Sequence, residues 1–220
     1  MKQIQASDGH KLYVYTAKPT GEIKGSIVVL QEIFGINRHI QSVADRFAND
    51  GFLAVAPALF DRVTPGIELG YTEAEIAQGI KLRQQLSWDK ILLDVEAAYN
   101  LAKSQSDKGV AIVGYCFGGS ATWRSATQLK LFQKAICYYG GEIYTHVDEQ
   151  PNCPVIMHFG NKDTSITAQH VKLIEEAHPE IQVYKYDAGH AFNRDGSSNY
   201  DQKSAALAYQ RTLEFLNKAT

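Results

Sequence analysis

Short apolar segments alternate with amphipathic segments along most of this chain, and this alternation restricts the possible folds more than any other feature. Residues 26–30 and 52–56 are apolar runs typical of strands buried on both faces. Residues 38–49, between them, carry apolar side chains at helical spacing. A strand, a helix and a second strand in this order predict two parallel strands joined by a right-handed crossover. The pattern indicates an α/β protein with a mostly parallel sheet.

The same alternation continues to the last residues of the chain. A polar turn at residues 7–10 predicts a hairpin before the first buried strand. Further strands are expected at 109–113, 134–139, 154–159 and 181–186. Helices are expected from residue 72 onward and at 91–102, 117–128, 167–178 and 200–217. Because no repeat, linker or break in composition interrupts the pattern, we predict a single domain over residues 1–220, with about six parallel strands flanked by helices.

Composition and charge exclude several classes of protein. The chain has 22 Lys and Arg against 24 Asp and Glu, a formal net charge of −2, which gives no basic footprint for nucleic acid. Its cysteines form no C-x-x-C pair, so neither a disulfide framework nor a zinc site is indicated. The first residues lack the apolar core of a signal peptide, and no segment approaches the roughly 18 apolar residues of a membrane span. We expect a cytoplasmic monomer that contacts neither nucleic acid nor membrane and holds no metal or cofactor.

One turn presents a reactive side chain in a recognisable setting. The strand at 109–113 runs into G-Y-C-F-G-G at 114–119, which is the nucleophile-elbow pattern G-x-C-x-G with a thiol in place of the hydroxyl. A sharp strand-to-helix turn would hold Cys116 above the sheet, and such a turn needs small residues where Gly114 and Gly118 stand. The N-terminus of the following helix would favour the thiolate form of Cys116.

Other interpretations of this glycine-rich turn compete with catalysis. A dinucleotide-binding G-x-G-x-x-G turn requires glycine where Cys116 stands, because a side chain there would obstruct the pyrophosphate. Cys116 can also be a buried structural residue, as most free cysteines are. The partners available to the thiol decide between these interpretations.

Asp163 and His190 follow two later strands, at the positions where an α/β-hydrolase fold carries its acid and its histidine. Asp163 comes just after the strand at 154–159, and His190 comes just after the strand at 181–186. The order nucleophile, acid, histidine is that of the α/β hydrolases. His190 can take a proton from the Cys116 thiol and later from a water molecule, and Asp163 can fix the tautomer of His190. We therefore predict a Cys-His-Asp triad.

The remaining histidines and cysteines show no comparable arrangement. His158 lies inside an apolar strand and is expected to be a hydrogen-bonded core residue. Cys137 and Cys153 stand at the edges of strands, where packing is the expected role. The other histidines are expected on turns or helix surfaces, and they are His10, His39, His146, His170 and His178.

Several ordered motifs make the chain resemble the dienelactone hydrolase family (carboxymethylenebutenolidases). They are Q-E-I-F-G-I-N at 31–37, G-Y-C-F-G-G at 114–119, Y-Y-G-G at 138–141, G-N-K-D at 160–163 and G-H-A-F-N-R at 189–194. The resemblance covers nearly the whole chain and implies an α/β-hydrolase fold, with Cys116 as nucleophile, His190 as base and Asp163 as the orienting acid. It also implies that the backbone N–H groups of Ile33 and Phe117 are the oxyanion donors.

Further positions acquire a role through the same resemblance. The carboxylate of Glu32 is expected to pair with the thiol in the resting enzyme, and Arg194 is expected to bind a substrate carboxylate. Tyr139 falls at a position that lines the substrate site. A second carboxylate-binding arginine of the family is replaced here by Ile76, and Arg83, two turns further along, is the candidate substitute.

Together these residues predict a hydrolase that cleaves a small lactone or ester through a thioester intermediate. Because a thiolate suits substrates with good leaving groups, little peptidase activity is expected. A broader carboxylesterase or thioesterase is the alternative among hydrolases, since a weaker anion clamp puts dienelactone itself in doubt. A hydrolase-fold binding protein without catalysis and a thiol redox sensor based on Cys116 are the alternatives from other classes.

Overall fold

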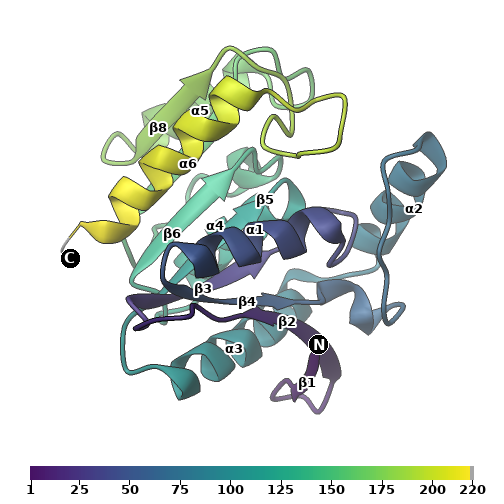
Figure 1. Cartoon of the computed structure of the whole chain (residues 1–220). Coiled ribbons are helices and arrows are strands. Elements are labelled where there is room, and N and C mark those ends of the chain that lie inside the picture. Colours follow the sequence, from purple (N-terminus) through teal and green to yellow (C-terminus); the bar gives the residue numbers. More distant parts are fainter. Residues whose placement is uncertain (219–220) are drawn as a thin grey trace.

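The computed structural model describes residues 1–218 and arranges their eight strands in one sheet of order β1-β2-β4-β3-β5-β6-β7-β8 (Figure 1). The strands are β1 (Lys2–Gln5), β2 (Lys11–Ala17), β3 (Gly25–Leu30), β4 (Phe52–Pro57), β5 (Val110–Tyr115), β6 (Lys134–Tyr138), β7 (Val155–Gly160) and β8 (Gln182–Tyr186). β2 pairs antiparallel with β1 and β4, whereas the pairs from β4 to β8 are all parallel. The predicted α/β class, hairpin and run of parallel strands are confirmed.

Helices cover both faces of this sheet (Figure 1). They are α1 (Arg38–Asn49), α2 (Glu73–Gln84), α3 (Trp88–Gln105), α4 (Phe117–Gln128), α5 (Ala168–Ala177) and α6 (Gln202–Asn217), with short 3-10 helices η1 (Leu59–Arg62) and η2 (Ile143–His146). α1 packs on β2, β3 and β4, while α3 and α4 pack against each other on the opposite face. Because parallel strands end at one edge of the sheet, the loops after β3, β5, β6, β7 and β8 meet there.

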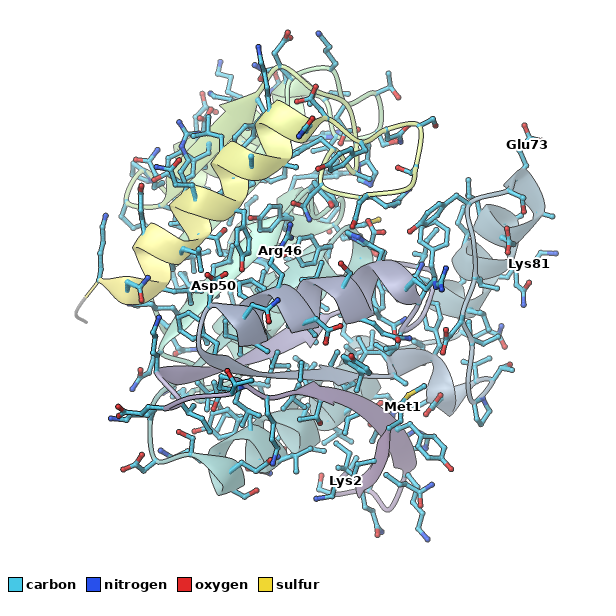
Figure 2. All side chains as sticks on the ribbon, viewed as in Figure 1. Met1, Lys2, Arg46, Asp50, Glu73 and Lys81 are labelled. Atoms are coloured by element: carbon cyan, nitrogen blue, oxygen red, sulfur yellow. The ribbon has the colours of Figure 1, made fainter. Side chains whose placement is uncertain are left out.

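Contacts between side chains hold α6 beside α1. The Tyr209 hydroxyl donates to the Asp50 carboxylate at 2.5 Å, and the Arg46 guanidinium lies 4.1 Å from the centre of the Tyr209 ring. Figure 2 shows Arg46 and Asp50 between the two helices. These contacts hold the middle of α6 against the C-terminal end of α1.

Local sequence explains where α1 and α2 begin. The Asn37 side chain accepts the backbone N–H of Ile40 at 3.3 Å, which caps α1. Thr72 and Glu75 form a reciprocal capping box at the start of α2. This agrees with the sequence, in which acidic residues follow Thr72 and predict a helix cap there. α2 stands at one side of the molecule, and Figure 1 shows it set apart from the sheet.

Two histidines expected on surfaces are buried instead. The side chains of His39 and His178 are each only 1% exposed, because segments far along the chain cover them. His158 is a core residue as predicted: its Nδ1 lies 2.8 Å from the Tyr186 hydroxyl, and burial lowers the pKa of His158 to about 3. Within residues 1–218, no helix combines the length and apolar character needed to traverse a bilayer, and no three potential metal ligands are grouped together.

Candidate active site

Cys116 occupies a sharp turn between β5 and α4. Its φ of 54° lies in a region that non-glycine residues rarely adopt. Both neighbouring glycines are required, since a Cβ on Gly114 would lie 2.0 Å from the Gly118 carbonyl oxygen, and one on Gly118 would lie 2.4 Å from the Leu30 carbonyl oxygen. The turn thus presents the thiol at the N-terminus of α4.

His190 and Asp163, in the loops after β8 and β7, form a chain of contacts to this thiol. His190 Nε2 lies 3.3 Å from Cys116 Sγ, and His190 Nδ1 lies 2.7 Å from Asp163 Oδ2. The other carboxylate oxygen of Asp163 accepts the backbone N–H groups of Ser165 and Ile166 at 2.8 and 2.9 Å. The Asp163 side chain is fully buried while 23% of the His190 side chain is exposed, so a substrate can reach the imidazole and not the acid.

These groups shift one another's pKa. Burial alone would lower the pKa of His190, but the negative charge of Cys116 and the hydrogen bond to Asp163 outweigh it and raise this pKa to about 10. Burial would also raise the pKa of Asp163, yet its hydrogen bonds with His190 and with backbone N–H groups lower it below its usual value. The contacts of His190 therefore favour its protonated, imidazolium form.

Replacing Cys116 by Ala is expected to lower the pKa of His190, because burial then acts without the opposing charge on sulfur. In the unaltered protein, the raised pKa stabilises the fold fully below about pH 6.5, and this contribution disappears as the pH rises through about 10. NMR titration of the imidazole in both proteins measures the change. A variant whose His190 still titrates near pH 10 would show that Cys116 does not raise the pKa of His190.

Glu32, in the loop after β3, is held by Arg194 from the loop after β8. Arg194 Nε lies 2.7 Å from Glu32 Oε2 and Nη2 lies 3.0 Å from Oε1, a bidentate pair. Only 1% of the Glu32 side chain and 8% of the Arg194 side chain are exposed. The expected pairing of Glu32 with the thiol is not the arrangement found here. A buried carboxylate needs a full positive charge beside it, which Arg194 supplies and a thiol cannot.

The two residues expected to supply oxyanion donors stand beside these groups in the chain. Phe117 follows Cys116 directly and is the first residue of α4. Backbone N–H groups in the first turn of a helix have no acceptor within the helix, so that of Phe117 is available to a substrate oxygen. Ile33 follows Glu32, and its carbonyl oxygen lies against α2, where a Cβ on Gly79 would approach it to 2.1 Å.

Residues with strained backbone conformations lie close to Cys116 and His190. Within residues 1–218, positive φ at non-glycine residues occurs at Cys116, at Tyr139 (37°) and at Ala191 (59°). The buried ring of Tyr139 lies 5.2 Å from the His190 ring, and Ala191 follows His190. Strained backbone that recurs at one place in a fold is typical of functional sites.

Arg83 borders the site from α2 but its charge is already matched. Its Nη2 lies 2.9 Å from Glu142 Oε2, and its Nη1 donates to the Leu86 carbonyl at 3.0 Å. The guanidinium lies 4.4 Å from the centre of the Trp88 ring and 4.9 Å from that of Phe117. Arg83 therefore reaches the neighbourhood of the oxyanion donors as half of an ion pair with Glu142.

Sequence reasoning also missed the contact between His39 and Asp195, which supports the site. His39 Nδ1 lies 2.5 Å from Asp195 Oδ1, which ties the N-terminus of α1 to the loop that carries His190 and Arg194. A signal for the burial of His39 was present, because it stands four residues before Val43 on the apolar face of α1. Its partner, 156 residues away, had no such signal.

Comparison with known proteins identifies the family. The model of the dienelactone hydrolase family matches residues 12–220. The chain belongs to the dienelactone hydrolase family. A carboxymethylenebutenolidase of Pseudomonas putida is 35% identical over 222 residues, covering 97% of this chain and 94% of the relative. Carboxymethylenebutenolidase 1 of Cupriavidus pinatubonensis is 32% identical over 222 residues with the same coverage, 97% and 94%. The chain is thus a carboxymethylenebutenolidase-like hydrolase.

Solved structures agree with this assignment. A dienelactone hydrolase-type protein from Klebsiella pneumoniae superposes with a TM-score of 0.84 at 26% identity, covering 98% of both chains. A dienelactone hydrolase-like promiscuous phosphotriesterase from metagenomic libraries gives a TM-score of 0.78 at 19% identity, covering 97% of this chain and 95% of that one. The second likeness shows the shared fold. The predicted α/β-hydrolase fold and the resemblance to dienelactone hydrolases are therefore confirmed.

Proposed function

We propose that this dienelactone hydrolase family member cleaves small carboxylic esters or lactones through a thioester on Cys116. The observation that carries the proposal is the continuous contact from Asp163 through His190 to Cys116, with distances of 2.7 and 3.3 Å. The Pseudomonas and Cupriavidus relatives are named for hydrolysis of a butenolide, which is a lactone, and this supports the same class of reaction.

Acylation of Cys116 is the first step of the proposed reaction. The sulfur forms a bond to the carbonyl carbon while the backbone N–H groups of Ile33 and Phe117 stabilise the oxyanion, each contributing about 3 kcal/mol. The C–O bond then breaks, and the leaving oxygen takes the proton of the His190 imidazolium. Asp163 holds the imidazole in the tautomer and orientation that this transfer needs.

Deacylation reverses the roles of the same groups. His190, now neutral, accepts a proton from water as the water oxygen bonds to the thioester carbonyl. The C–S bond breaks, the free carboxylic acid leaves, and the thiolate–imidazolium pair returns. Since a thiolate is itself a good leaving group, the first step proceeds best when the substrate expels a stabilised oxygen such as an enolate or a phenolate.

A trapped intermediate tests this function. After brief exposure to an activated ester and an acid quench, peptide mass spectrometry should find the acyl group on Cys116. The matched control is Cys153, which is half-buried and whose pKa burial raises to about 11, so it should stay unmodified. Turnover without any adduct would contradict the thioester route. Sulfenic acid on Cys116 with no ester turnover would support the redox sensor instead.

A further inference from the structure

His39 and Asp195 join two segments that both border the proposed catalytic groups. His39 is the second residue of α1, and Asp195 lies in the loop between β8 and α6. Figure 1 shows this loop beside the N-terminal end of α1. His39 Nδ1 lies 2.5 Å from Asp195 Oδ1, and this hydrogen bond lowers the pKa of Asp195 below its usual value. The acceptor is therefore a carboxylate at neutral pH, and the bond is of the strong, charge-assisted kind.

A second contact joins the same two segments. Arg194, next to Asp195 in the chain, forms its bidentate ion pair with Glu32, which precedes α1. Two segments joined at one point can still pivot about it, whereas contacts at two separate points fix their relative orientation. The bond between His39 and Asp195 supplies the second point.

Each of these segments carries a group that the proposed reaction needs. The segment of residues 31–39 includes Ile33, the expected oxyanion donor, and the segment of residues 190–195 begins with the base His190. The relative orientation of the two segments therefore decides whether base and donor can reach the same ester group. In such arrangements a displacement of about 1 Å can cost about 100-fold in rate.

His39 also contacts the strand that leads to the proposed nucleophile. Its ring lies edge-on to the ring of Tyr115, with the ring centres 6.0 Å apart and the planes at 78°. Tyr115 is fully buried, ends β5 and directly precedes Cys116. The His39 ring thus lies between the end of this strand and the loop that carries the base.

The hydrogen bond to Asp195 is the one polar contact of the His39 ring within residues 1–218. Only 1% of the His39 side chain is exposed, and its Nε2 is buried without a hydrogen-bond partner there. A buried ring nitrogen without a partner costs stability, and an apolar ring of similar size would avoid that cost. The imidazole therefore adds the direction of one hydrogen bond rather than stability.

We propose that His39 and Asp195 are positioning residues, whose hydrogen bond keeps His190 correctly placed beside Cys116. This inference rests on the proposed hydrolytic function. Both residues act through the loop after β8 and the end of β5, and not on the substrate itself. The rate of hydrolysis should therefore depend on this bond, whereas substrate binding should depend on it little.

Asp195→Ala tests the proposal without disturbing the core, because the Asp195 side chain is 52% exposed. With an activated ester such as 4-nitrophenyl acetate, kcat should fall about tenfold while KM changes by less than about twofold. Asp195→Asn keeps an oxygen acceptor in place of Oδ1 and should restore kcat to within about threefold of the unaltered protein. Steady-state kinetics measures both parameters, and circular dichroism establishes that each variant is folded.

His178 and Glu180 provide a matched control. The His178 side chain is also 1% exposed, and its Nδ1 lies 3.2 Å from Oε1 of Glu180, whose side chain is 59% exposed. This contact links residues two positions apart after α5, and it does not join the two segments described above. Glu180→Ala should therefore leave kcat unchanged.

A double substitution shows whether the two residues act through one bond. His39→Phe keeps an aromatic ring beside Tyr115 and removes the donor to Asp195, so it should lower kcat as Asp195→Ala does. The combination His39→Phe/Asp195→Ala should be no slower than the slower single variant, because both changes remove the same bond. Losses that multiply in the double variant would overturn the shared positioning role.

The remaining outcomes separate this inference from the proposed function. A kcat for Asp195→Ala within about twofold of the unaltered protein would overturn the positioning role alone, and so would an Asp195→Asn enzyme as slow as Asp195→Ala. Absence of ester turnover by the unaltered protein would overturn the proposed function and the positioning role with it.

Discussion

Replacing Cys116 by Ala is expected to lower kcat/KM for an activated ester such as 4-nitrophenyl acetate by about 10⁴-fold or more. The substitution removes the sulfur atom that forms the acyl intermediate in the proposed reaction. What remains is water activated by His190 together with the backbone donors, and such remnants of a catalytic triad retain only a small part of its rate enhancement. Steady-state kinetics with purified proteins measures the loss.

The matched control for this substitution is Cys153→Ala. Cys153 is also half-buried, and it stands before β7 rather than at the elbow, so its removal should leave the rate unchanged. Circular dichroism of both variants establishes that they are folded. A Cys116→Ala enzyme that retains activity within tenfold of the unaltered protein would show that the thiol is not the nucleophile.

The arrangement of the site follows from features that the sequence displays locally. The parallel strands from β3 to β7 were visible as short, mostly apolar runs, whereas β8 is mixed in polarity. The loops after parallel strands meet at one edge of the sheet. That rule alone is enough to bring Cys116, Asp163 and His190 together, although 74 residues separate Cys116 from His190. Position within a regular topology thus predicts which side chains can meet.

Pairs of side chains in irregular loops were harder to predict from the sequence. Glu32 and Arg194 lie 162 residues apart, and no periodicity or motif spacing indicates that one neutralises the other. The same holds for Arg83 and Glu142, 59 residues apart on α2 and in the loop after β6. These pairs depend on how loops pack over the end of the sheet, which hydrophobic patterning does not specify.

Replacing Arg194 by Met is expected to lower the free energy of unfolding by about 3–5 kcal/mol. The change leaves the Glu32 carboxylate, 1% exposed, without the positive charge that burial requires. The Arg194 guanidinium lies 4.7 Å from the centre of the Phe34 ring and 5.0 Å from that of Tyr71. A methionine side chain can pack against the same two rings, so most of the packing is preserved. Equilibrium unfolding in urea, followed by circular dichroism, measures the loss.

A second substitution separates lost charge from lost packing. In Glu32→Gln/Arg194→Met the buried charge is gone, so most of the lost stability should return, because the penalty arises from an unpaired carboxylate rather than from the missing guanidinium. Arg83→Met is the matched control: its partner Glu142 is 43% exposed, and this change should cost about 1 kcal/mol or less. If Arg194→Met costs no more than Arg83→Met, solvent must reach Glu32, and the buried ion pair could not then be what organises the proposed active site.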